Sequence, residues 1–148
     1  MKPLDEKDRI ILNVLRKEAK LSTKELSRKT KIPITTIHNR MKRMEGSGII
    51  KGYTVVLDNQ LTGNVISFVL ISVMYRLPGG EVINQEELAK KVATHEMVEE
   101  VSIITGSMDL IAKVRANTVE DLNNFVIHYL RTIAGIERTQ TLVVLKSL

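Results

Sequence analysis

The sequence predicts an α+β protein of two parts: an N-terminal helix-turn-helix domain of winged-helix type and a C-terminal domain of ferredoxin-like βαββαβ order. Two observations support this prediction. Residues 1–60 contain 14 Lys and Arg against 7 Asp and Glu, a net charge of +7, whereas residues 61–148 contain 8 against 10, a net charge of −2. Helical periodicity fills the first part, and strand and helix patterns alternate in the second. The expected domains are 1–50 and 65–148, joined by an extended segment, 51–64.

Three helices are expected in the N-terminal part. The first, residues 5–18, has apolar residues at helical spacing. The second, residues 22–30, begins with Ser22 and Glu25 in the pattern of a capping box. The third, residues 33–45, begins at a proline, which the first turn of a helix tolerates, and ends before a Gly-Ser-Gly stretch. A short helix, a tight turn and a second helix form the helix-turn-helix unit.

The third helix has two chemically different sides. Ile34, Ile37, Met41 and Met44 fall on one side at 100° per residue, and short polar groups and cations fall on the other. A helix that enters the DNA major groove needs this arrangement. Asn39 can pair bidentately with adenine, and Arg40 or Arg43 can pair with guanine. The candidate DNA contacts of the whole domain are Ser22, Thr23, Lys24, Lys31, Thr35, Thr36, His38, Asn39, Arg40, Lys42 and Arg43.

The other members of this set have chemically plausible roles. The three lysines are point charges for phosphates, and the amide groups at the start of the second helix can hold another phosphate. Thr35 and Thr36 can contact bases, thymine methyl groups or phosphate, and His38 flanks the polar side. A protein-interaction domain with a solvated basic face is the alternative that these residues leave open.

Strands and helices alternate after a polar, turn-rich boundary at residues 58–64. The expected strands are 65–75, 98–105, 110–116 and 136–145, and the expected helices are 85–94 and a segment that begins after Thr118 and ends at Gly135. In a ferredoxin-like domain the two helices cover one face of the sheet. The bare face would carry apolar residues such as Ile111 and Val143, which predicts a homodimer or larger assembly through it. An apolar ligand on that face is the alternative.

The composition excludes several functions. The chain has no cysteine, which removes disulfides, thiolate zinc sites and cysteine nucleophiles, and its three histidines lie far apart. No glycine-rich phosphate loop is present. The longest apolar run, Val65 to Tyr75, is shorter than a membrane span. The N-terminus has no apolar signal core, so we expect a cytoplasmic protein with no membrane partner and no metal or cofactor site.

Over nearly its full length the chain resembles the Lrp/AsnC (leucine-responsive, feast/famine) family of transcriptional regulators. Several stretches, in this order, are similar to the family's motifs. They are Leu4-Asp5 with Asp8, Ile11 and Leu12; Glu25-Leu26-Ser27; Thr36-Ile37 with Arg40 to Glu45; Gly48 to Tyr53; Thr105 to Leu110; and Gly135-Ile136 with Thr139 to Thr141.

The resemblance implies a prokaryotic regulator that binds double-stranded promoter DNA, often at its own gene. It implies dimers that assemble into tetramers, octamers or larger rings, and a C-terminal domain that senses an amino acid between dimers. The effector-binding residues that it implies are Thr105, Gly106, Ser107, Met108, Asp109, Thr139 and Thr141. Glycine amides can hold a carboxylate and Asp109 can pair with an α-ammonium group, although Gly106 and Asp109 also suit a plain hairpin turn.

Two features depart from the family's pattern. Pro33 stands where the family often has a serine that caps the recognition helix. The loop from Arg76 to Asn84 is longer than usual. Two other functions stay open: an architectural protein that coats DNA with little specificity, and, much less favoured, an enzyme shaped like some haem-pathway decarboxylases, for which the chain lacks a His/Arg cluster or carboxylate pair.

Overall fold

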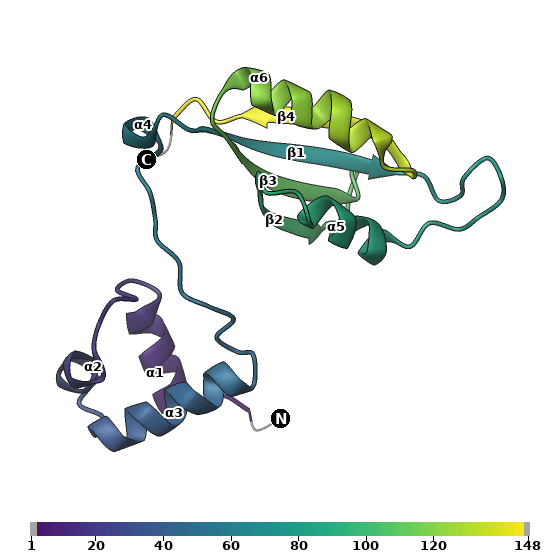
Figure 1. Ribbon diagram of the computed structural model, residues 1–148. Helices are drawn as coiled ribbons and strands as arrows, with labels where there is room; N and C mark the ends of the chain where they lie inside the picture. Colours follow the sequence, from purple (N-terminus) through teal and green to yellow (C-terminus); the bar gives the residue numbers. More distant parts are fainter. Residues whose placement is uncertain (1–2, 147–148) are drawn as a thin grey trace. The chain divides into compact units, whose positions relative to one another are not determined.

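The computed structural model describes residues 3–146, apart from the side chain of Gln60, and the chain divides into two units, residues 1–56 and 57–148 (Figure 1). The division falls inside the expected connecting segment, 51–64. The outer domain bounds expected at residues 1 and 148 lie outside the described residues.

Three helices form the first unit: α1 (Glu6–Leu15), α2 (Thr23–Thr30) and α3 (Ile34–Gly46). Their core consists of Ile11, Leu15, Leu26, Ile32, Ile37 and Met44. The first helix ends three residues earlier than expected, because the side chains of residues 16–20 are all exposed and no buried contact holds another turn. The helix-turn-helix arrangement that the sequence predicts is confirmed.

The second unit contains a four-stranded antiparallel sheet with the strand order β2-β3-β1-β4. Its elements are α4 (Asn59–Thr62), β1 (Val65–Val73), α5 (Gln85–Ala93), β2 (Val98–Ile103), β3 (Leu110–Ala116), α6 (Val119–Asn124) and β4 (Ile136–Val143). The predicted βαββαβ order is confirmed. The short helix α4 stands where the sequence indicated only a polar boundary.

The helix expected up to Gly135 changes its winding along its length. It is α-helical only in α6, continues as a π-helix over Phe125–Tyr129 and ends as a 3₁₀ turn over Leu130–Thr132. The Leu130 N–H donates to the Phe125 carbonyl, the five-residue step of a π-helix. Both side chains are buried against the sheet. The expected helix is therefore present but not α-helical throughout, and it ends at Thr132; the wider turn brings residues five apart onto the same side.

The two helices cover one face of the sheet and leave the other open. Strand residues Val69, Ile71, Leu110, Ala112 and Val114 pack against helix residues Leu88, Val92, Leu122, Phe125 and Leu130. Alternate side chains of the same strands point to the opposite, open face. No described helix is long and apolar enough to cross a membrane.

The strand register corrects one predicted residue of the open face. Val143 lies opposite Ser67, and Ser67 lies opposite the core residue Val114, so Val143 belongs to the helix-covered face. Its neighbour Leu142 lies opposite Phe68 and faces the open side. A shift of one residue along a strand exchanges the two faces, which is why the sequence placed Val143 wrongly. Ile111 lies opposite Leu70 on the open face, as predicted.

Candidate nucleic-acid interface and ligand-binding turn

The start of α2 is closed by a capping box. The Glu25 N–H donates to Ser22 Oγ at 3.3 Å, and the Ser22 N–H donates to the Glu25 carboxylate at 2.8 Å. The backbone and side chain of Ser22 are thus both engaged within the chain. The amides of Thr23 and Lys24 in the first turn have no acceptor within the helix, and they remain available to a phosphate.

The turn between α2 and α3 depends on one residue with a left-handed backbone. Lys31 has φ of 60°, and its N–H donates to the Ser27 carbonyl at 2.9 Å. The Ser27 hydroxyl then donates to the Ile32 carbonyl at 2.6 Å. Pro33 follows as the N-cap of α3 and makes no side-chain cap hydrogen bond. The turn, rather than a cap, therefore fixes where α3 begins, and it leaves the Lys31 side chain exposed.

The exposed side of α3 presents a row of polar groups. The side chains of Thr35, His38, Asn39 and Lys42 are exposed, whereas Thr36 is half-buried. Ile37 and Met44 anchor the opposite side in the core. Ile34, expected to lie on the apolar side, is 47% exposed at the first turn. A firmly seated helix thus offers amide, imidazole, hydroxyl and ammonium groups on one side.

The two arginines of α3 have partners in α1 and at its N-cap, Asp5. Arg40 Nη1 donates to both Asp5 oxygens at 2.6 and 2.7 Å and to Asp8 Oδ1 at 2.8 Å. Arg43 Nη2 donates to Asp8 Oδ2. The Asp8 side chain is completely buried. The sequence indicated that Arg40 or Arg43 reads guanine, but it did not show that both guanidinium groups are shared with these carboxylates.

The ion pairs shift the pKa values of the carboxyl groups. Hydrogen bonding to Arg40, followed by the Asp8 amide, lowers the pKa of Asp5 to about 2. Burial raises the pKa of Asp8, but hydrogen bonds from Arg40, the Asp5 amide and Arg43 together outweigh burial and leave that pKa below its usual value. Both carboxyl groups are therefore charged at neutral pH, and their charges hold α3 against α1.

The predicted effector turn lies between β2 and β3. Gly106 adopts φ of +132°, a conformation that other residues rarely take. Thr105, Gly106 and Ser107 are exposed, and Met108 is buried. The Asp109 carboxylate accepts hydrogen bonds from the Val73 N–H at 2.8 Å and from Gln85 Nε2 at 3.1 Å. Asp109 therefore ties the end of β1 to the start of α5.

A hollow of about 820 Å³ lies beside Asp109. It is lined by the end of β1, the residues around the start of α5 and Ile103 of β2. The two other predicted effector residues, Thr139 and Thr141, lie on β4 opposite Ile71 and Val69 of β1. They are separated from β3 by β1, about 10 Å at the usual strand spacing. One copy of the chain therefore does not gather the whole predicted set in one place.

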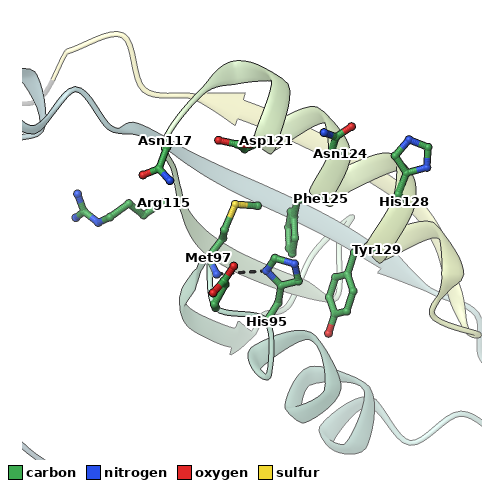
Figure 2. A pocket seen from close by; sticks show the side chains of 10 residues that line it. His95, Met97, Arg115, Asn117, Asp121, Asn124, Phe125, His128 and Tyr129 are labelled. Carbon is green, nitrogen blue, oxygen red and sulfur yellow. Dashed lines mark hydrogen bonds between the residues drawn. The ribbon is translucent and has the colours of Figure 1, made fainter.

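A second hollow, of about 580 Å³, lies between the end of α5 and the π-helical turn (Figure 2). His95 accepts the Met97 N–H at 3.2 Å and packs against Phe125 and Tyr129, with ring centroids 4.8 and 4.5 Å away. The Tyr129 hydroxyl donates to the Lys91 carbonyl at 2.7 Å. These contacts fasten the two helices together, and no sequence motif pointed to them. No three His, Asp or Glu side chains in residues 3–146 are arranged to hold a metal ion.

Comparison with family models divides the chain in the same way. Residues 4–51 match a winged helix-turn-helix DNA-binding model, and residues 69–148 match the Lrp/AsnC ligand-binding domain. The chain is 35% identical to the HTH-type transcriptional regulator FL11 of Pyrococcus furiosus over 144 residues, which is 97% of this chain and 90% of that relative. The FL11 protein of Pyrococcus horikoshii is 33% identical over 98% of this chain and 91% of its own length.

Solved structures share the fold. Escherichia coli AsnC superposes with a TM-score of 0.71 at 27% identity, covering 99% of this chain and 95% of AsnC. A transcriptional regulator of Neisseria meningitidis, solved as a complex with L-Met, gives a TM-score of 0.78 at 24% identity, covering 99% of this chain and 92% of that protein.

Acid should weaken the contact between α1 and α3. Because the pKa of Asp5 falls from 3.8 to about 2 in the folded chain, its stabilising effect is fully present above pH 4 and is lost as the pH falls through 2. We expect amide hydrogen exchange of α1 and α3 to accelerate between pH 4 and 2, after correction for the intrinsic exchange rate. Asp5→Asn, which keeps a good N-cap, should reduce this acceleration.

Glu6→Gln is the matched control, since Glu6 is the next carboxylate in the chain and makes no side-chain hydrogen bond to any described residue. An Asp5→Asn protein with the same acid-induced acceleration as the Glu6→Gln protein would contradict this role of Asp5.

Proposed function

Because the chain belongs to the Lrp/AsnC family of transcriptional regulators, we propose that it reads specific double-stranded promoter sequences with α3 and adjusts this binding to an amino acid. The observation that carries the proposal is the exposed polar row on α3, backed by the buried side chains of Ile37 and Met44. A helix with this exposed composition on a fixed base suits major-groove readout.

Asn39 is the residue best suited to read a base. Its amide is exposed and makes no hydrogen bond to any described residue, so it can pair bidentately with an adenine edge. Thr35 and His38 stand beside it at the first turns of α3. Lys42, Lys31 and Lys24 are exposed cations for phosphates, together with the free amides at the start of α2.

An architectural protein with little sequence preference is the second candidate. The net charge of +7 on residues 1–60 favours phosphate binding whatever the sequence. The two functions differ in one quantity, the ratio of the affinity for a preferred duplex to that for a shuffled duplex. A ratio of about 10³ or more indicates a specific regulator.

We also propose a homodimer through the open sheet face. Phe68, Leu70 and Ile111 lie side by side there and are only half-buried in one copy, and Leu142 at its margin is 45% exposed. A contiguous apolar surface of this kind marks an interface. Further assembly into tetramers, octamers or larger rings would place the turn that ends at Asp109 between dimers.

The proposed effector is an amino acid bound at this turn. The exposed amides of residues 105–107 can bind a carboxylate, and Asp109 is an acceptor for an ammonium group beside the 820 Å³ hollow. A protein of the same fold was solved with L-Met, which supports this choice of ligand class. The proposal includes binding to the promoter of its own gene and action in the cytoplasm.

Substitutions on α3 should separate base reading from phosphate binding. Asn39→Ala should lower the affinity for a duplex enriched from a random library by about 1–3 kcal/mol and leave the affinity for a shuffled duplex unchanged. Lys42→Ala should weaken binding to both duplexes and reduce the slope of log K against log salt by about 1. Fluorescence anisotropy at several salt concentrations measures both. An Asn39→Ala protein with the wild-type preference would remove Asn39 from the reading set.

The open face should control assembly. Leu142→Glu places an unpaired charge in the proposed interface and should weaken dimerisation by about tenfold or more. Val143→Glu is a matched control, because both residues are 45% exposed on the same strand but point to opposite faces. Sedimentation velocity over a range of concentrations measures the difference. Equal effects of the two substitutions would contradict an interface on the open face.

Amino acids should shift DNA binding through Asp109. We expect at least one of the twenty amino acids to change the affinity for the enriched duplex by about 5- to 150-fold. Asp109→Asn should remove this response, because the amide still accepts the Val73 N–H but loses the negative charge. Glu81→Gln, in an exposed loop, should keep it. An amino acid that binds in calorimetry but leaves DNA affinity unchanged would exclude control by that ligand.

A further inference from the structure

Asp8 of α1, the N-cap Asp5 and two arginines of α3 form one neutral network in the first unit. Asp8 is completely buried and receives Arg40 on one oxygen and Arg43 on the other. Asp5 is 43% exposed; its carboxylate accepts from Arg40 and from the Asp8 N–H but makes no contact with Arg43. The network adds no net charge to the DNA-facing side. Its contribution is the geometry that it imposes on the arginines.

Arg43 belongs both to this network and to the exposed side of α3. It follows Asn39 by four residues, so the two side chains are neighbours on the helix surface. The Arg43 side chain is 33% exposed, against 21% for Arg40. A guanidinium group has five N–H donors in one plane. The contact with Asp8 uses Nη2, and the other two guanidinium nitrogens of Arg43 donate to no group in the described part of the chain.

We propose that Asp8 is a positioning residue for DNA recognition: it fixes the plane of the Arg43 guanidinium so that the free nitrogens meet a guanine edge next to the base that Asn39 reads. This inference rests on the proposed function. It changes the sequence-based interpretation, in which Arg40 and Arg43 were equal candidates, because Arg40 is shared between two carboxylates and faces α1. It also gives a buried carboxylate a part in specificity although it touches no DNA.

The burial of Asp8 suits it to this task. A long, flexible arginine loses conformational freedom when it docks on a base, and an arginine already held in place loses less. A carboxylate at the surface would be screened by salt and could move together with the arginine. A buried carboxylate is screened less and moves less. A phosphate contact needs only a nearby cation, but a bidentate base contact needs a fixed plane.

The test compares Asp8→Asn with the wild-type protein on two duplexes: one enriched by the wild-type protein from a random library, and a shuffled duplex of the same composition. The affinity for the enriched duplex should fall about tenfold. The affinity for the shuffled duplex should stay the same or rise, because a negative charge has been removed. Partial unfolding would lower both affinities by the same factor, so a purely structural role of Asp8 predicts an unchanged ratio.

Asp5→Asn is the matched control. It removes the same charge from the same network and keeps a good N-cap, but it does not touch Arg43. The ratio of the two affinities should therefore equal the wild-type ratio.

Arg43→Lys keeps the inference testable if Asp8→Asn does not fold. Lysine keeps the positive charge but lacks the planar group, so the ratio of the affinities for the enriched and the shuffled duplex should fall by about the same factor as in Asp8→Asn. The Asp8→Asn, Arg43→Lys double variant should show no further fall in this ratio. An unchanged ratio in Arg43→Lys, or in a folded Asp8→Asn protein, overturns the inference. A wild-type ratio near one would instead contradict the proposed function itself, and the inference would fall with it.

Discussion

A carboxylate buried between two helices needs positively charged partners, and this requirement determines how α1 and α3 fit together. Asp8 is fully buried and both of its oxygens accept hydrogen bonds from arginines of α3. Removing one partner of such a group typically costs about 3–5 kcal/mol, a large share of the stability of a small domain. Among the residues that the structure describes, the core of the first unit has only six buried apolar side chains. The ion pairs therefore specify how α3 lies against α1, because so small an apolar core alone would tolerate several arrangements of the two helices.

Limited burial of apolar side chains also accounts for the open face of the second unit. Its helices cover one face of a four-stranded sheet, and in the proposed homodimer a second copy protects the apolar side chains of the other face. The edge strands also differ in chemistry: Glu99 of β2 pairs with Lys113 and Arg115 of β3, while Arg138 and Gln140 precede Leu142 on the same face of β4. Charged groups at the margin of an apolar patch allow association in one register and disfavour open-ended stacking.

Most of the architecture could be predicted from local patterns. The capping boxes at Ser22 and Thr118 marked helix starts correctly, because they depend only on residues three apart. The face of Val143 and the π-helical turn could not be predicted, since strand register and helix winding depend on packing against distant elements. At the candidate site, the polar side of α3 was visible as periodicity. The pairing of Arg40 and Arg43 with Asp5 and Asp8 could not be predicted from any local pattern, because it joins residues more than 30 positions apart.

The connecting segment joins two units that have separate hydrophobic cores. Residues 51–58 form no helix or strand, so they cannot transmit force as a rigid element. The first ordered element after them is α4, and Arg115 of β3 holds it by donating to Asn59 Oδ1 at 2.6 Å. Arg115 also pairs with Glu99 of β2. Arg115 therefore links the position of α4, and with it the end of the connecting segment, to the strands of the sheet. The proposed assembly and effector binding, if they displace β2 or β3, would therefore displace the end of this segment through Arg115.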